Sequence, residues 1–176
     1  MSGICQSRVV IITGAGGGLG AAHAKEFANE GASVVVNDIN QQAAAAVVEE
    51  IVASGGKAVA NHSDITNYDD AQNAVTQAIE VFGGLDIVVN NAGINRDRMF
   101  ASLSEAEWDA IMAVHLKGHF CISSHAVQYW RAQFKAGNPV SARIINTTSG
   151  AGLQGSVGQS NYAAAKAGIA ALTLNQ

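Results

Sequence analysis

The chain alternates between short apolar runs and longer segments with helical character. The apolar runs are residues 8–13, 33–38, 57–60, 85–90 and 142–147. Most of them lack strict alternation of apolar and polar positions, which is typical of strands covered on both faces, as in a parallel sheet between helices. The pattern therefore predicts an α/β fold in which strands and helices alternate along the chain.

The segments between the runs carry signals for the ends of helices. Residues 19–30, 41–54 and 69–82 are each followed by glycine, which readily adopts the left-handed conformation found where helices end. Ser104 and Glu107 form a capping-box pattern, so a long helix is predicted from Ser104 toward Phe134. A last helix is expected at residues 160–174. No linker divides the chain, which predicts a single domain over residues 1–176.

Charge and hydropathy exclude several kinds of partner. The 10 basic and 14 acidic residues give a net charge of −4, and no run of Lys and Arg is present to bind nucleic acid or an anionic membrane. The apolar stretch 9–12 near the start is far shorter than a signal sequence or a membrane span. We therefore expect a cytoplasmic protein that acts on a small molecule, with no nucleic-acid or membrane partner.

A glycine-rich loop, Thr13-Gly-Ala-Gly-Gly-Gly-Leu-Gly, follows the first predicted strand and opens the first helix. In this context Gly14 can make the sharp turn, and Gly18 leaves room for a pyrophosphate at the helix N-terminus, where free N–H groups favour an anion. Leu19 is expected beside the cofactor, and Gly20 allows the helix to pack closely on the strand. The alternative is a tight turn without a ligand.

Asp38 stands at the end of the second predicted strand. A carboxylate there can accept hydrogen bonds from the adenosine ribose hydroxyls and repels a 2′-phosphate, and no Arg or Lys stands in the glycine loop or beside Asp38 to offset that repulsion. The cofactor is therefore predicted to be NAD rather than NADP, in a doubly wound parallel sheet of the Rossmann type. The alternative is that Asp38 is only a solvated acid at a strand end, and the choice between NAD and NADP then stays open.

The last predicted helix carries a second candidate for chemistry. Tyr162 and Lys166 are four positions apart, so they share one face of that helix, and a neighbouring ammonium favours the phenolate that a general base needs. Ser149, just past the fifth strand, can hold a substrate oxygen in line with the phenol. Alternatively, Tyr162 and Lys166 are an amphipathic pair that covers the core, and Ser149 belongs to an ordinary turn.

The combined motifs resemble the short-chain dehydrogenase/reductase family. They are Thr13-Gly-x-x-x-Gly-x-Gly20, Asn90-Asn-Ala-Gly93, Ser149 and Tyr162-x-x-x-Lys166. The resemblance implies the strand order 3-2-1-4-5 and a role for Lys166 in binding the nicotinamide ribose. It also implies that Asn91 and Gly93 lie near the cofactor and that Asp64 and Ile65 contact the adenine ring. An Asx turn leading into Thr66 is an equal alternative for Asp64.

His115 occupies the position where many family members carry an Asn that completes a proton relay with Tyr and Lys. An imidazole can also relay a proton. This histidine, the stretch Asn95-Arg-Asp-Arg98 and Trp108 resemble 3-oxoacyl-ACP reductase and 3-hydroxyacyl-CoA dehydrogenase members, which implies an acyl-thioester substrate. His115 and His119 are four apart, but without the Glu of an HExxH pattern or an evident third ligand no metal site is predicted.

The resemblance also implies features beyond residue 176. Family members usually continue with a mobile substrate loop and with sixth and seventh strands, so the domain is expected to be incomplete at its C-terminus, with the fifth strand as an exposed edge. The long and last helices resemble those that pair subunits, which implies a homo-oligomer, dimer or tetramer.

We predict an NAD-dependent oxidoreductase for a secondary alcohol or ketone. The alternatives are a catalytically incompetent nucleotide-binding or oligomerising module and, as a runner-up enzyme, an NAD-using epimerase or dehydratase.

Overall fold

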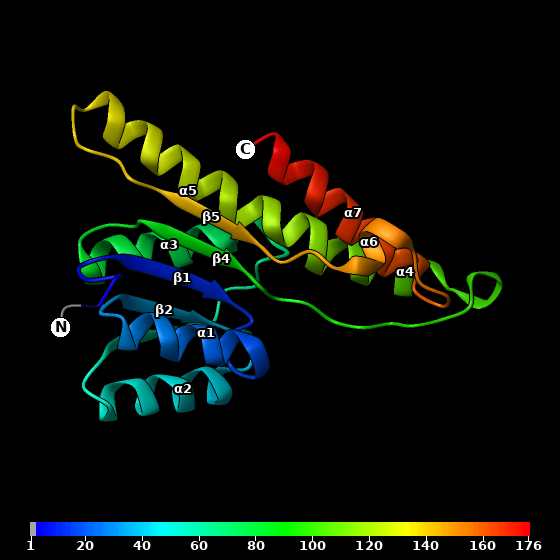
Figure 1. Cartoon of the computed structure of the whole chain (residues 1–176), viewed down its shortest axis with the longest axis horizontal. Coiled ribbons are helices and arrows are strands. Elements are labelled where there is room, and N and C mark those ends of the chain that lie inside the picture. Colours follow the sequence, from blue (N-terminus) through cyan, green and yellow to red (C-terminus); the bar gives the residue numbers. More distant parts are fainter. Residues whose placement is uncertain (1–2) are drawn as a thin grey trace.

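A computed structural model describes residues 3–176 as a three-layer arrangement with one parallel sheet (Figure 1). The described strands follow the order β3-β2-β1-β4-β5. Their bounds are Val9–Thr13 for β1, Ser33–Asn37 for β2, Lys57–Asn61 for β3, Ile87–Asn90 for β4 and Arg143–Asn146 for β5. This confirms the predicted fold class and strand order.

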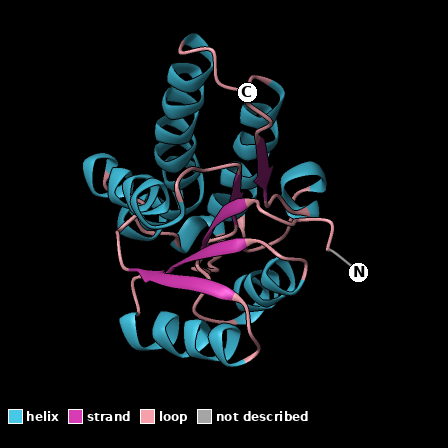
Figure 2. Cartoon of the chain, turned by 90° about the vertical axis from the view of Figure 1, so that its left-hand side faces the viewer, coloured by secondary structure: helices cyan, strands magenta, loops and turns pink. Residues whose placement is uncertain are grey.

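Helices cover both faces of the sheet, as Figure 2 shows. One face packs α1 (Gly18–Asn29) and α2 (Gln41–Ala53) against a buried cluster that includes Val10, Ile12 and Val34. The other face packs α3 (Tyr68–Phe82) and α5 (Gly118–Lys135) against Ile11 and Val88. Because successive side chains of a strand point to opposite faces, burial on both sides explains why the strands show no apolar and polar alternation.

The helical region after β4 differs from the single helix predicted over residues 104–134. It consists of a 3₁₀ turn (Phe100–Ser102), α4 (Glu105–Ile111), a π-helical turn (Met112–Lys117) and α5. The Ser104 capping box with Glu107 is present and starts α4 as predicted. The prediction of one regular helix was wrong at the π turn, where a wider i to i+5 turn interrupts the helix and His115 is buried against the Ile94 backbone.

Two helices follow β5, and α6 (Gly150–Gln154) and the start of α7 (Ser160–Leu174) lie near the carboxyl ends of the strands (Figure 1). The short α6 was not predicted, whereas α7 has the expected bounds. β5 forms the edge of the described sheet, with Ile145 47% exposed. No helix within residues 3–176 combines the length and the apolar character needed to cross a membrane.

Candidate active site

At two positions of the glycine turn between β1 and α1, an added Cβ would collide with backbone atoms. Gly14 has a φ of 61°, in the left-handed region, and a Cβ there would lie 2.7 Å from Ala92 Cα. A Cβ on Gly20 would lie 2.2 Å from the Gly14 carbonyl oxygen. The first turn of α1 therefore packs directly against the end of β1, as predicted for these two glycines.

Gly18, like Gly17 before it, faces open space. A Cβ placed on Gly18 would meet no atom within 4 Å among the described residues, and its φ of 52° is again left-handed. No side chain caps the first turn of α1 in the described structure. The N–H groups at this helix end are thus free to bind an anionic group.

Thr13 and Asn91 tie the end of β4 to the glycine turn. The Thr13 hydroxyl oxygen accepts hydrogen bonds from Asn91 N at 3.0 Å and Ala92 N at 3.1 Å. In return, Asn91 Nδ2 donates to the carbonyl oxygens of Thr13 at 3.0 Å and Gly14 at 3.3 Å. The side chain of Asn91, expected near the cofactor, therefore holds the shape of the glycine turn.

Asp38 lies directly after β2 and is linked to the same turn. Its Oδ2 accepts a hydrogen bond from Gly16 N at 2.9 Å, and its Oδ1 accepts one from Asn40 N at 2.9 Å. These two backbone donors fix the orientation of the carboxylate at the rim of a cleft. Each oxygen keeps further acceptor capacity for a ligand hydroxyl.

The cleft has a volume of about 230 Å³ and brings together the ends of four neighbouring strands. Five residues predicted from the sequence line it, although they come from four separate loops: Gly14, Asp38, Asp64, Ile65 and Gly93. Gly18, Leu19 and Gly20 do not line it, and Leu19 is 71% exposed at the start of α1. Parallel strands end at one edge of a sheet, which is why residues so distant in the sequence meet here.

Asp64 forms the Asx turn that the sequence left as an alternative. Its Oδ1 accepts hydrogen bonds from Thr66 N at 2.8 Å and from Thr66 Oγ1 at 2.7 Å. The neighbouring Ile65 is buried and presents its apolar side chain to the cleft wall. Asp64 can therefore form the Asx turn and still belong to the cleft wall, because the turn positions the next residue, Ile65.

Lys166 and Tyr162 share one face of α7, as predicted from their spacing. The Lys166 ammonium lies 5.5 Å from the centroid of the Tyr162 ring and donates a hydrogen bond to the Thr147 carbonyl oxygen at 2.6 Å. The side chain is only 2% exposed. Burial lowers the pKa of Lys166 from 10.5 to about 8.

Ser149 stands where β5 leads into α6. Its Oγ accepts a hydrogen bond from Ala151 N at 3.2 Å and so caps the short helix. The hydroxyl hydrogen remains available to a substrate oxygen. Within α6, a Cβ on Gly152 would lie 2.6 Å from Ala167 N and 2.9 Å from Lys166 Cβ, so α6 packs tightly on the helix that carries Tyr162.

His115 lies against Tyr162, with the ring centroids 5.2 Å apart and the ring planes at 88°. Its Nε2 lies 2.8 Å from the Ile94 carbonyl oxygen and 3.1 Å from Ile94 N. A Cβ on Gly93 would lie 2.6 Å from His115 Cε1, so the glycine makes room for the imidazole. Burial is the main cause that lowers the pKa of His115, which keeps the ring neutral near neutral pH.

His119, one turn further along, is fully buried, and neither ring nitrogen has a hydrogen-bond partner among the described residues. Burial, with Lys166 and His115 nearby, lowers the pKa of His119 to about 3. Among residues 3–176, no group of three or more His, Cys, Asp or Glu side chains is placed to hold a metal ion.

Asn161, which the sequence reasoning did not single out, is fully buried directly before Tyr162. The feature of the sequence that could have identified Asn161 is its position in the first turn of the last predicted helix.

Comparison with known proteins identifies the family. The family model described as short chain dehydrogenase matches residues 8–175. The chain is 52% identical over 175 residues to the hydroxyacyl-CoA dehydrogenase ChsB1 of Mycobacterium tuberculosis, covering 96% of this chain and 55% of that protein. It is 46% identical to the peroxisomal hydratase-dehydrogenase-epimerase of Neurospora crassa, covering 94% of this chain and 19% of that protein.

A crystal structure of a short chain dehydrogenase from Mycobacterium avium has the same fold. Its TM-score is 0.96 at 60% sequence identity, covering 98% of this chain and 63% of that one. The chain therefore belongs to the short-chain dehydrogenase/reductase family of oxidoreductases, which confirms the predicted resemblance. It spans about half the length of the ChsB1 protein that it matches.

Proposed function

We propose that the chain transfers a hydride between NAD(H) and a secondary alcohol or ketone, with Ser149, Tyr162 and Lys166 as its catalytic residues. The observation that carries the proposal is the buried Lys166 ammonium packed against the Tyr162 ring, which also contacts His115 next to Gly93 of the cleft. Burying a cation beside a phenol costs free energy, and such buried ionisable groups are concentrated at sites of acid/base chemistry.

The residues at the carboxyl edge of the sheet fit a nicotinamide dinucleotide. The open side of Gly18 and the free first turn of α1 suit a pyrophosphate, with Leu19 beside it, and the cleft below Asp38 suits the adenosine. We assign Asp64, Ile65, Asn91 and Gly93 to the surroundings of the adenosine and the glycine turn. In the family, such a cofactor supplies the acceptor or donor of the hydride.

The chain's own residues then handle the proton and the geometry. For alcohol oxidation, Ser149 donates a hydrogen bond to the substrate oxygen, and Tyr162 removes the hydroxyl proton as a general base. Lys166 supports the phenolate by its charge and binds the nicotinamide ribose. We propose that His115, whose ring packs edge-on against the Tyr162 ring, takes the place of the relay Asn that many family members carry.

NAD is the proposed cofactor because Asp38 is held toward the cleft and no Lys or Arg lines it among the described residues. Replacing Asp38 by Ala removes the charge that repels a 2′-phosphate, so NADP binding should tighten by about tenfold while NAD binding weakens. Titration of both dinucleotides by tryptophan fluorescence measures the two dissociation constants. Preference for NADP in the unaltered chain would contradict the assignment.

A 3-hydroxyacyl or 3-oxoacyl thioester is the proposed substrate, since the relative from Mycobacterium tuberculosis is named a hydroxyacyl-CoA dehydrogenase. We further propose that the protein is a homo-oligomer and that it works in the cytoplasm. The peroxisomal name of the Neurospora crassa relative makes microscopy of a fluorescent fusion the direct test of location.

The test of the proposed reaction is Tyr162→Phe, assayed by NADH formation from secondary alcohols and 3-hydroxyacyl thioesters. We expect turnover to fall by at least about 10³-fold, because the variant has no proton acceptor, while NAD still binds. Retained turnover would remove Tyr162 from the mechanism. If the unaltered chain binds NAD and turns over none of these substrates, the alternative of a nucleotide-binding module is favoured.

A further inference from the structure

Asn161 is a buried polar residue that the reaction described above does not use. It is fully buried in the first turn of α7, directly before Tyr162. A buried amide is costly unless its donors and acceptor are satisfied, and here all of them find partners within the protein. The two acceptors of its amide N–H groups come from two other parts of the chain.

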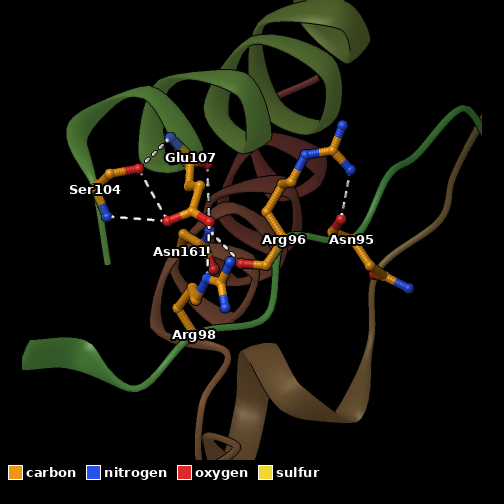
Figure 3. A network of polar contacts seen from close by, with 6 residues as sticks. All are labelled: Asn95, Arg96, Arg98, Ser104, Glu107 and Asn161. Carbon is orange, nitrogen blue, oxygen red and sulfur yellow. Dashed lines mark hydrogen bonds and ion pairs between the residues drawn. The ribbon is translucent and has the colours of Figure 1, made fainter. Parts of the chain in front are cut away.

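The three hydrogen bonds of Asn161 meet at the start of α7, as Figure 3 shows for the surrounding residues. Nδ2 donates to the Arg96 carbonyl oxygen at 3.2 Å and to the Glu107 carbonyl oxygen at 3.3 Å. Oδ1 accepts from Tyr162 N at 2.8 Å. The partners fix the orientation of the amide, since a flipped group would place its oxygen against two carbonyls.

The bond to Tyr162 N satisfies a donor that a helix normally leaves free. The first four N–H groups of an α-helix have no partner within the helix, and the Gln159 side chain does not cap α7. Asn161 thus holds the backbone of Tyr162 from inside the first turn. The same amide fixes that turn to α4 and to the segment after β4.

Further contacts attach this segment to α4 and to the residues before α7. Arg98 N donates to the Gly158 carbonyl oxygen at 2.8 Å, and Gln159 Nε2 donates to Asp97 Oδ2 at 3.0 Å. Arg98 Nε lies 2.9 Å from Glu107 Oε1. The segment 95–98 therefore connects α4 to the residues just before α7, with Asn161 as its buried centre.

We propose that Asn161 is a positioning residue that holds the Tyr162 phenol in place for proton transfer. The inference rests on the proposed function, because it gives Asn161 a role only through Tyr162. Asn161 does not line the cleft assigned to the adenosine, so its effect falls on the chemical step rather than on dinucleotide binding. A displacement of the phenol by about 1 Å is enough to lower a rate about 100-fold.

The test compares Asn161→Ala, Asn161→Asp and Tyr162→Phe in the whole 176-residue chain. For Asn161→Ala we expect kcat to fall about 10- to 100-fold, with the NAD dissociation constant changed less than about twofold. The chain has three tyrosines, so ring-labelled tyrosine gives an NMR spectrum in which Tyr162→Phe assigns the Tyr162 signal. We expect that signal to move and broaden in Asn161→Ala and its contact with His115 to weaken.

Asn161→Asp keeps the acceptor for Tyr162 N but loses both donors while the introduced carboxyl is ionised. Protonation restores one donor, so the ratio of its kcat to that of the unaltered chain should rise as the pH falls. Ser104→Ala is the matched control in the same network. It removes the α4 cap and should lower the melting temperature without moving the Tyr162 signal or kcat.

The outcomes separate the two proposals. If Tyr162→Phe retains turnover, the proposed function fails, whatever Asn161 does. If Tyr162→Phe is inactive while Asn161→Ala keeps its kcat and an unchanged Tyr162 signal, the positioning role is overturned. A fall in kcat for Ser104→Ala as large as for Asn161→Ala would also overturn it, because general loss of stability would then explain both.

Discussion

At the scale of single residues, the buried ammonium of Lys166 in the candidate active site lowers the stability of the folded chain. Its ammonium is buried, and its hydrogen bond goes to the Thr147 carbonyl oxygen. Among residues 3–176, no carboxylate forms a salt bridge with it. A charged group in such surroundings is destabilised, and its pKa falls to about 8. Catalytic sites commonly keep such groups at the expense of stability.

Lys166→Met should therefore make the protein more stable while abolishing turnover. Each pKa unit corresponds to about 1.4 kcal/mol, so after loss of the bond to Thr147 we expect a gain of about 2 kcal/mol at pH 6–7. Between pH 8 and 10.5 the unfolded state holds more protons than the folded state, so the unaltered chain gains stability and the difference shrinks. Urea unfolding at several pH values measures this, with exposed Lys57→Met as the control. A difference independent of pH would contradict it.

At the scale of elements, the site depends on how closely α1 approaches β1. Gly20 lies in the first turn of α1, against the Gly14 carbonyl oxygen, and Asn91 holds the same turn from the β4 side. The shape of the glycine turn is therefore set by packing between three elements. A change in any of these contacts should alter both stability and dinucleotide binding.

Gly20→Ala tests this packing. Its Cβ would lie 2.2 Å from a backbone oxygen, which has to shift, so we expect a loss of about 1–3 kcal/mol in unfolding free energy and weaker NAD binding. Gly150→Ala is the matched control, because Gly150 also lies in the first turn of a helix and a Cβ there meets no atom within 4 Å. Thermal unfolding and NAD titration compare the two. Equal stability of both variants would show that the turn adapts.

At the scale of the whole molecule, one face carries a large apolar hollow. It has a volume of about 520 Å³ and lies between α4, the π turn, α5 and α7, with Met112, Leu116, Phe120 and Leu172 among its lining. Phe120 is 48% exposed. The hollow lies on the helices that the family resemblance assigns to subunit pairing, which supports the proposed self-association.

Phe120→Glu should weaken that self-association. A carboxylate buried in an apolar interface costs free energy even though Lys117 also lines the hollow, so we expect the dissociation constant to rise by more than about tenfold. Sedimentation velocity over a range of concentrations measures it. Phe134→Glu is the control, since Phe134 is 75% exposed at the end of α5 and does not line the hollow. Equal masses for both variants would place the interface elsewhere.

Much of this architecture could be predicted from local patterns. The apolar runs identified the strands, and the glycines after α1, α2 and α3 have positive φ at Gly31, Gly55 and Gly83, as predicted. The spacing of Tyr162 and Lys166 placed them on one helical face. These features depend on neighbouring residues and on helical or strand periodicity, so the sequence alone contains them.

Other features required the folded chain. The attachment of Asn161 to two distant carbonyls and the cleft formed by four loops join residues far apart in the sequence, and the π turn is where His115 meets the Ile94 backbone. The sequence by itself determined the order of the elements and the chemical groups at their ends. The tertiary structure alone decided which groups meet, which are buried and how their pKa values move, because desolvation and long-range contacts exist only after the layers have packed.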